Sequence, residues 1–189
     1  MTERNAPLVS VIIPTYNSAR TLPLALRSIK RQTHPSVEII VVDRYSRDGT
    51  PYIVSRFGAH VIQADTERAE AKNIGLKAAK GQYVLFLNSD MELTPTVIQE
   101  CVKLMEGNFA IGAVVKPEIT VGNSLVAKIR RYEQLHYENT YIESPRFYRK
   151  GPAIQAGGLD PEVVFYEETT FAYKIGYRKV EAKSIYTSS

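Results

Sequence analysis

Short apolar runs, rich in β-branched residues, recur along the first half of the chain and end in polar residues. Runs of this kind are typical of strands in a parallel sheet that is covered on both faces. The predicted strands are residues 8–13, 37–42, 60–63 and 82–87.

The segments between these runs have the spacing of amphipathic helices. Apolar side chains recur at helical period across 22–29, and a further helix is expected at 69–79, before Lys80-Gly81. Thr50-Pro51 and Thr94-Pro95 each place a capping residue before proline, which predicts a helix start. Alternation of strand and helix predicts an α/β fold with a mostly parallel sheet and helices on both faces.

This alternation stops beyond Gly107. We expect a strand at 113–116, a helix at 124–137 and an irregular or extended stretch at 145–156. A chain of 189 residues fits a single domain. The first half, 1–107, then builds the sheet, and the second half, 108–189, is an appendage that completes a site.

The single cysteine, Cys101, lies in a helical pattern and is expected to pack as a small apolar residue. One cysteine and no signal-like stretch at the N-terminus favour a reducing, cytoplasmic compartment. No apolar run approaches the roughly 18 residues of a membrane span.

The formal net charge of +4 suits an anionic partner but does not choose between nucleotide, nucleic acid and lipid. Much of the excess is local, since six basic and three acidic residues lie between Lys128 and Lys150. Aromatic residues are interleaved with them and predict either an acceptor platform or core packing. These rings are Tyr132, Tyr137, Tyr141, Phe147 and Tyr148.

Polar and acidic residues follow two of the predicted strands. Asp43 comes after the second strand, and Asn88-Ser89-Asp90 follows the strand at 82–87. Ligands of open α/β sheets bind beyond the carboxyl ends of the strands, so Asp90 is placed to hold a metal or a ligand hydroxyl. The alternative is a purely local role, because these residue types are common in turns.

Several common sites are excluded by the sequence. Pro14 to Asn17 follows the first strand without the glycines of a dinucleotide-binding turn or a P-loop. The three histidines are far apart and lack metal-ligand spacing, and no Gly-x-Ser-x-Gly elbow is present.

Five ordered stretches carry a resemblance to a known family. They are Val9–Asn17, Glu38–Asp43 with Ser46–Thr50, Ala71–Gly81, Phe86–Asp90, and Gly157–Asp160 with Phe165–Glu168. In this order they resemble the motifs of the family 2 glycosyltransferases of the GT-A fold, which are inverting enzymes that use nucleotide-diphosphate sugars. The resemblance covers nearly the whole chain. It implies a single GT-A-like domain, with a nucleotide-sugar half at 1–107 and an acceptor half at 108–189.

The resemblance also implies residue roles. Asp90 would hold a divalent cation, Mn²⁺ or Mg²⁺, that bridges the diphosphate. For Arg68 and Lys72, a solvated helix face is the alternative to a diphosphate contact. The residues implied to contact the nucleotide are Pro14, Thr15, Tyr16, Asn17, Asp43, Arg68, Lys72, Asn88 and Ser89.

On the acceptor side, the resemblance makes Glu168 the general base, with Glu167 as the fallback. A carboxylate within hydrogen-bond reach can take the proton of the attacking hydroxyl. The alternative is that both glutamates only begin a helix, where negative side chains are favoured.

Three departures from the family pattern motivate a rival hypothesis. Asn88 replaces the first acid of the D-x-D motif, and Arg44 replaces the second acid after strand two. Many relatives also have a metal-binding histidine just after the last strand, where Ile185-Tyr186-Thr187 offers none. A degenerate domain that binds a nucleotide or sugar without turnover is therefore the alternative to a transferase.

The expected partners are a nucleotide-sugar donor and a sugar or lipid-linked acceptor. The basic, aromatic segment also suits peripheral contact with an anionic membrane surface. A nucleic-acid-binding module rests on that segment alone and is not expected.

Overall fold

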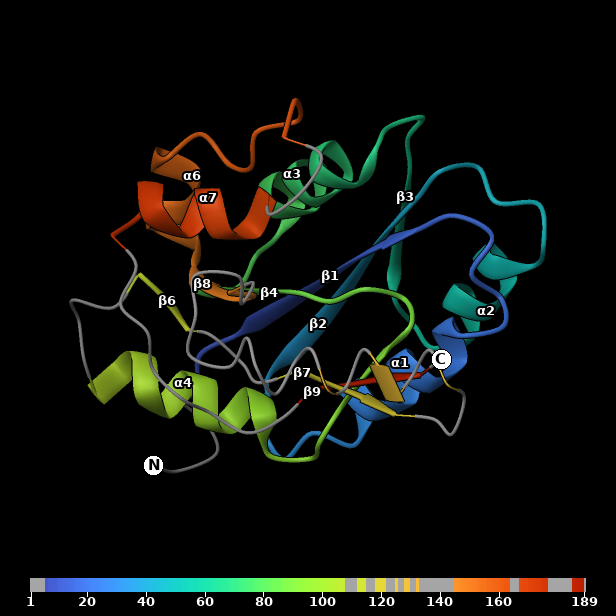
Figure 1. Ribbon diagram of the computed structural model, residues 1–189, viewed down its shortest axis with the longest axis horizontal. Coiled ribbons are helices and arrows are strands. Elements are labelled where there is room, and N and C mark those ends of the chain that lie inside the picture. The colour runs from blue at the N-terminus through green and yellow to red at the C-terminus, as the bar shows by residue number, and fades with distance from the viewer. Residues whose placement is uncertain are drawn as a thin grey trace.

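The structure is a computed structural model that describes residues 6–107, 112–114, 118–121, 125, 128–129, 132, 145–163, 167–176 and 185–188. A six-stranded sheet in the order β3-β2-β1-β4-β8-β6 runs through its centre (Figure 1). The strands are β1 (Val9–Thr15), β2 (Val37–Asp43), β3 (His60–Gln63), β4 (Tyr83–Phe86), β6 (Ala113–Val114) and β8 (Phe147–Arg149).

The first four strands are parallel, whereas β8 pairs antiparallel with both β4 and β6. The predicted α/β fold with a mostly parallel sheet is therefore confirmed. The second half of the chain is more than an appendage, because β8 and β6 extend the same sheet. The stretch at 145–156 forms β8 and then helix α6 (Lys150–Gln155).

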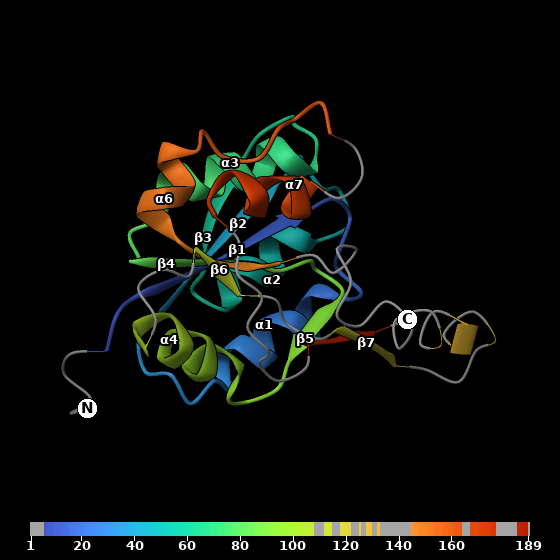
Figure 2. The ribbon, with the colours of Figure 1, turned by 60° about the vertical axis from the view of Figure 1, so that its left-hand side comes forward.

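Helices cover both faces of this sheet (Figure 2). One face packs against α1 (Leu22–Lys30) and α4 (Val97–Gly107), and the other against α3 (Arg68–Ala78), α6 and α7 (Glu167–Lys174). Helix α2 (Thr50–Arg56) packs beside β3. Strand β1 shows the two-residue period that this sandwich requires, since Val11 and Ile13 belong to one core and Ile12 to the other.

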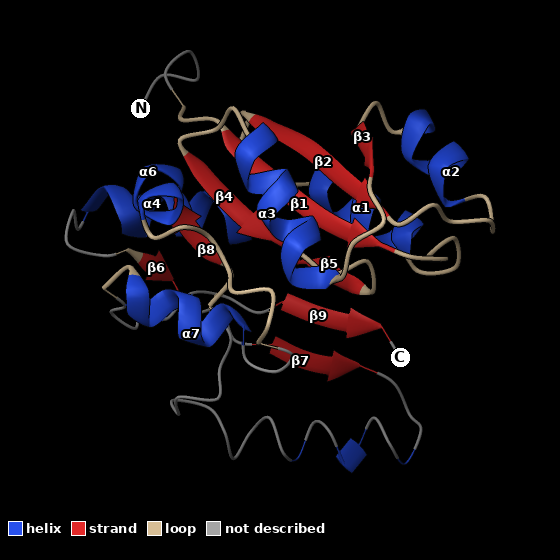
Figure 3. Ribbon diagram, turned by 90° about the horizontal axis from the view of Figure 1, so that it is seen from above, coloured by secondary structure: helices blue, strands red, loops and turns tan. Residues whose placement is uncertain are grey.

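A second, three-stranded sheet in the order β5-β9-β7 lies beside the first (Figure 3). Its strands are β5 (Met91–Leu93), β7 (Glu118–Val121) and β9 (Ile185–Ser188). The sequence predicted a helix start at Thr94-Pro95, but β5 directly follows Asp90 and α4 begins at Val97. Three residues are too few for a sequence pattern, and the partner strand of β5 lies far along the chain.

Three further expectations are settled at described residues. Cys101 is fully buried in the core, as predicted. Residues 125, 128, 129 and 132 are helical, whereas the rest of the expected helix at 124–137 lies outside the described residues. None of the described helices combines the length and apolarity needed to cross a membrane.

Helix α3 lies unusually close to β1. A Cβ atom added to Gly75 would come within 2.3 Å of Cγ2 of Ile12, which is closer than real Cβ contacts allow. Glycine is therefore required here by the packing of helix on strand rather than by backbone conformation.

We predict that Gly75→Ala lowers the free energy of unfolding by about 1–3 kcal/mol, because the new methyl group overpacks the core beside Ile12. The matched control is Gly107→Ala at the end of α4, where an added Cβ meets nothing within 4 Å. That change should be neutral or stabilising by up to about 1 kcal/mol through helix propensity. Urea denaturation of both variants measures the difference. Equal effects would show that α3 can move off the sheet.

Candidate active site

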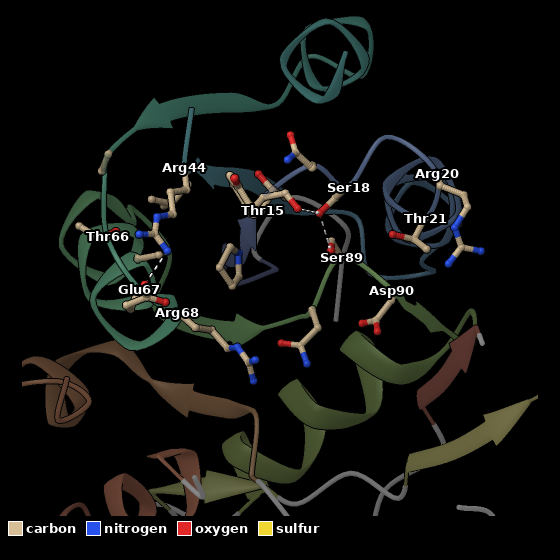
Figure 4. Close-up of a pocket in the computed structure, with 17 residues that line it drawn as sticks. Thr15, Ser18, Arg20, Thr21, Arg44, Thr66, Glu67, Arg68, Ser89 and Asp90 are labelled. Carbon is tan, nitrogen blue, oxygen red and sulfur yellow. Dashed lines mark hydrogen bonds and ion pairs between the residues drawn. The ribbon is translucent and has the colours of Figure 1, made fainter. Parts of the chain in front are cut away.

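A cavity of about 900 Å³ opens beyond the carboxyl ends of β1, β2 and β4 (Figure 4). Eight residues predicted to contact a ligand line it: Pro14, Thr15, Tyr16, Asn17, Arg68, Asn88, Ser89 and Asp90. The sequence analysis missed Ser18, Arg20, Thr21, Thr66 and Glu67 as lining residues. Each of these lies within four residues of a predicted one, so adjacency to the motifs was the available signal.

Hydrogen bonds to the loop after β2 fix the loop after β1. The backbone N–H of Asn17 donates to Ser46 Oγ at 2.7 Å, and Asn17 Oδ1 accepts from the N–H of Arg47 at 2.9 Å. Asn17 has a φ of 48°, in the left-handed region that asparagine tolerates better than most residues. Next to this turn, Tyr16 is left 63% exposed at the cavity.

Asp43 lies behind the cavity wall instead of in it. The residue is 0% exposed, and its carboxylate accepts hydrogen bonds from Thr15 Oγ1 at 2.8 Å and from Ser46 Oγ at 2.6 Å. The Ser46 N–H and Gln63 Nε2 donate to the same carboxylate. Protein donors thus reach both oxygens of Asp43, and its predicted contact with the base or ribose stays a prediction. Asp43 shapes the loops that form the wall.

Arg44 takes up the exposed position next to it. Its guanidinium Nε lies 3.1 Å from Asp65 Oδ1, and its Cζ lies 5.9 Å from the centre of the Tyr16 ring. A second hollow of about 480 Å³ lies here, and its lining residues are Tyr16, Arg44, Tyr45, Arg47 and Asp65. The departure at position 44 therefore places a cation and an aromatic face at this end of the site.

The turn after β4 and the loop before α3 each carry a buried polar atom without a protein partner among the described residues. Within the described part of the chain, Asn88 Oδ1 and Thr66 Oγ1 are buried and lack a hydrogen-bond partner, and both residues line the cavity. A buried acceptor left unsatisfied costs about 1–3 kcal/mol, so these atoms point to a ligand or bound water. Ser89 Oγ donates to Ser18 Oγ at 3.0 Å, which joins this turn to the loop after β1.

Asp90 and Asn88 fit a divalent cation as a partial oxygen-donor set. Among the described residues, no group of three or more histidine, cysteine, aspartate or glutamate side chains is arranged to hold a metal. The exposed Asp90 carboxylate and the unsatisfied Asn88 oxygen nevertheless belong to the donor classes that Mg²⁺ and Mn²⁺ prefer. The remaining ligands would have to come from the bound molecule and from water.

The two cations predicted to contact a diphosphate have different positions. Arg68 extends into the cavity from the start of α3 (Figure 4). Lys72 is 0% exposed, and its ammonium binds Glu167 Oε1 at 3.1 Å and also Glu168 Oε1. Lys72 is therefore not on a solvated helix face; it is not among the residues that line the cavity, and its predicted diphosphate contact stays a prediction.

Glu167 and Glu168 begin α7 and are each 5% exposed. Neither is among the residues that line the cavity. Besides Lys72, Arg146 Nη1 lies 3.4 Å from Glu168 Oε1. Burial raises the pKa of Glu168, but the charges of Lys72 and Arg146 outweigh it and hold that pKa below its ordinary value.

Asn73 fixes the other acceptor-side motif. Its Oδ1 accepts from the N–H of Leu159 at 2.8 Å, and its Nδ2 donates to the Leu159 carbonyl at 2.8 Å. Gly158 adopts a φ of 77° and leaves no room for a Cβ beside Asn73 Oδ1. Three consecutive residues of α3 thus have three roles. Ala71 lines the cavity, Lys72 binds the glutamates, and Asn73 binds the Leu159 backbone next to the Gly157-Gly158 turn.

The rings of the predicted aromatic platform differ in burial. Phe147 and Tyr148 are fully buried, so core packing is correct for them. Tyr132 is 64% exposed, whereas Tyr137 and Tyr141 lie outside the described residues, as do Phe165 and Tyr166 of the last motif.

Comparison with known proteins agrees with this geometry. Residues 10–156 match the family model described as glycosyl transferase family 2. The chain is 30% identical over 135 residues to the UDP-Glc:alpha-D-GlcNAc-diphosphoundecaprenol beta-1,3-glucosyltransferase WfgD of Escherichia coli, covering 69% of this chain and 53% of WfgD. It is 40% identical over 91 residues to the putative teichuronic acid biosynthesis glycosyltransferase TuaG of Bacillus subtilis, covering 44% of this chain and 36% of TuaG. The chain thus spans about half the length, or less, of these curated relatives.

Solved structures share the fold over almost the whole chain. The structure of S. aureus TarS 1-349 in complex with UDP aligns with a TM-score of 0.79 at 23% identity, covering 96% of this chain and 60% of that one. The mannosyltransferase PcManGT from Pyrobaculum calidifontis, in complex with GDP-Man and Mn²⁺, aligns with a TM-score of 0.73 at 25% identity, covering 99% and 58%. The fold is that of the GT-A glycosyltransferases, and the chain belongs to glycosyl transferase family 2.

Proposed function

We propose that this protein transfers a sugar, most simply a hexose, from a nucleotide-diphosphate sugar to an acceptor hydroxyl, with inversion and with the help of a divalent cation. The observation that carries the proposal is the cavity at the strand ends. Arg68, Asp90 and the unsatisfied oxygens of Asn88 and Thr66 all belong to its wall.

The nucleotide would lie along this wall. Tyr16 and Arg44 offer a ring and a cation at one end, where a base can stack and accept hydrogen bonds. Arg68 and Arg20 supply positive charge for the diphosphate. The relatives solved with UDP and with GDP-Man and Mn²⁺ support a donor of this class.

Asp90 and the Asn88 side-chain oxygen would hold the cation. When bound there, the cation would neutralise the negative charge that builds on the diphosphate leaving group. Asp90 is the only carboxylate of the turn after β4 that lines the cavity, so it would contribute the charge on the protein side.

Glu168 would act as the general base, with Glu167 as the fallback. As the acceptor oxygen bonds to the sugar carbon, its proton passes to the carboxylate and the carbon–oxygen bond to the diphosphate breaks. Because Lys72 and Arg146 lower the pKa of Glu168, the carboxylate is ionised at neutral pH and can accept that proton.

A degenerate binding domain is the second candidate. The burial of both glutamates in ion pairs and the amide at position 88 favour it. Such a domain would bind nucleotide diphosphate in the same cavity but would show no transfer.

The acceptor would be a sugar or a lipid-linked sugar, as the name of WfgD indicates for that relative, and the protein would act at the cytoplasmic membrane surface. Leu125, Ile129 and Tyr132 are 73%, 49% and 64% exposed and share one helix face by their spacing. The short helical piece drawn beyond β7, which belongs to the described residues between 125 and 132, lies away from both sheets (Figures 2 and 3). Exposed Lys128 adds positive charge, as suits an anionic lipid surface.

The metal role of Asp90 leads to a first prediction. Asp90→Asn should weaken UDP or GDP binding at least tenfold when Mn²⁺ is present, because a cation–carboxylate contact at about 4 Å is worth roughly 4 kcal/mol at intermediate dielectric. Binding without metal should change little. Isothermal titration calorimetry measures both affinities. Asp160→Asn, outside the cavity, is the matched control, and an Asp90 variant with unchanged Mn²⁺-dependent affinity would contradict the assignment.

The base role of Glu168 leads to a second prediction. Glu168→Gln keeps size but cannot take the proton, so transfer should fall by about 10²–10⁴ while donor affinity stays within a few-fold. Glu167→Gln should have a much smaller effect. Transfer is measured as nucleotide diphosphate release from a panel of nucleotide sugars, with thermal unfolding as the check on folding.

Two outcomes of that assay would reject the assignment. If Glu167→Gln abolishes transfer and Glu168→Gln does not, the base is Glu167. If wild-type protein binds the nucleotide but transfers nothing to any acceptor tested, the degenerate domain is correct.

The exposed helix face leads to a third prediction. Wild-type protein should sediment with vesicles of phosphatidylglycerol and phosphatidylcholine but not with phosphatidylcholine alone. Leu125→Asn with Ile129→Asn should reduce this binding several-fold, because the apolar face no longer enters the lipid. Leu24→Asn, at a residue exposed on α1, is the control. Binding that is independent of anionic lipid would contradict the role of the positive charge. Absence of vesicle binding, or binding unaffected by the double change, would contradict the assigned membrane surface.

A further inference from the structure

Four charged side chains form a buried cluster between α3, α7 and the residues before β8. The ammonium of Lys72 contacts Oε1 of both Glu167 and Glu168, and Arg146 contacts Glu168 Oε1 as well. These side chains are between 0% and 8% exposed. Two positive and two negative groups make the cluster neutral at pH 7.

Burial on this scale makes each charge depend on its partners. An ammonium removed from water costs several kcal/mol unless opposite charges and hydrogen bonds compensate it. Lys72 is the shared member, because it binds both glutamates, whereas Arg146 is paired with Glu168. A change at Lys72 therefore leaves two carboxylates beside a single cation.

The contacts of Glu168 are one-sided. Lys72 and Arg146 both bind Oε1, and no other described side chain donates to Oε2. Holding one carboxylate oxygen with two donors fixes the direction in which the other oxygen faces. The side chains that support Glu168 therefore bind only one of its two carboxylate oxygens.

Lys72 is also placed to relate this carboxylate to the donor cavity. It lies one helical turn after Arg68 and directly follows Ala71, and both of these line the cavity. Asn73, the next residue, holds the Leu159 backbone on both sides. Gly75 packs closely on Ile12, which fixes the position of α3 on β1.

We propose that Lys72 is a positioning residue for proton transfer: its ammonium holds Oε1 of Glu168 so that Oε2 receives the proton of the acceptor hydroxyl. This inference rests on the proposed function. In the step it describes, the acceptor O–H bond breaks as the proton moves to Oε2. The new bond from oxygen to the sugar carbon forms, and the electron pair of the broken carbon–oxygen bond leaves with the nucleotide diphosphate.

The charge of Lys72 also affects when Glu168 is ionised. The groups that face Glu168 are Lys72 on α3, Arg146 before β8 and Glu167 on α7, while Tyr148 donates its hydroxyl to the Glu168 backbone carbonyl. Without the Lys72 charge, burial and Glu167 would dominate, so the pKa of Glu168 should rise. A base works only when deprotonated, so activity would then be lost at a higher pH.

The test uses Lys72→Met, Lys72→Arg and the charge-balanced double variant Lys72→Met with Glu167→Gln. For Lys72→Met we expect kcat/KM at pH 7 to fall at least tenfold and the acid limb of its pH profile to move up by at least one pH unit. Donor affinity should stay within a few-fold. Lys72→Arg should recover much of the activity and the position of the limb.

The double variant separates positioning from charge balance. It retains one cation and one carboxylate, so it keeps the fold testable if Lys72→Met alone does not fold. Its stability should recover while transfer stays low, because no donor from α3 holds Oε1. Recovery of full transfer would overturn the positioning role, and so would a Lys72→Met enzyme that loses activity with an unmoved acid limb. A parallel loss of donor affinity would instead make Lys72 a nucleotide contact.

A second readout keeps this inference separable from the proposed function. Carbon-13 NMR titration of the glutamate carboxyls reports the pKa of Glu168 without turnover. If wild-type protein transfers no sugar but the pKa of Glu168 rises in Lys72→Met, the proposed function fails while the electrostatic effect of Lys72 stands. If that pKa does not rise, the inference fails even if the wild-type enzyme is active.

Discussion

The buried ion pairs between Lys72 and the two glutamates of α7 join the two halves of this protein. Glu167 and Glu168 compensate the buried ammonium from nearly a hundred residues further along the chain. An unpaired charge at this depth would cost several kcal/mol, which is a large part of the stability of a typical domain. The ion pairs therefore hold α7 against α3, and α3 in turn forms part of the cavity wall. The acceptor-side carboxylates and the donor cavity are thus connected through one helix.

The cavity itself is built on a second buried charge. Parallel strands bring the loops after β1, β2 and β4 to one edge, but an edge alone does not define a binding surface. Asp43 satisfies donors from both of the first two loops, and Ser46 in turn accepts the N–H of Asn17. With the loops fixed in this way, Tyr16 and Arg44 stay exposed at one end of the site. The polar groups that remain unsatisfied, on Asn88 and Thr66, face the space where a ligand would lie.

Most of the first half was predictable from sequence, because its signals are local. Apolar runs and helical spacing identified β1 to β4 and α1 to α3, and strand-end rules identified Asp90 and its neighbours as cavity residues. What the sequence did not reveal has a non-local cause. Asp43 and Lys72 are polar residues in motifs, and only tertiary pairing shows that they are buried. Strand β5 is three residues long, and the choice between an acceptor platform and core packing for Tyr148 stayed open until β8 was placed inside the sheet. Local patterns therefore located the site. Which of its residues line the cavity and which are buried behind it could be read only from the structure.

The central claim is that the cavity at the strand ends is a donor site for a nucleotide-diphosphate sugar with a cation at Asp90. A crystal structure of the protein with UDP or GDP and Mn²⁺ tests it most directly, because manganese gives an anomalous signal. The account predicts an anomalous peak within coordination distance of Asp90, with the diphosphate beside Arg68 and the base near Tyr16 and Arg44. A nucleotide bound outside this cavity, or a manganese peak at Glu167 and Glu168 instead of Asp90, would contradict it.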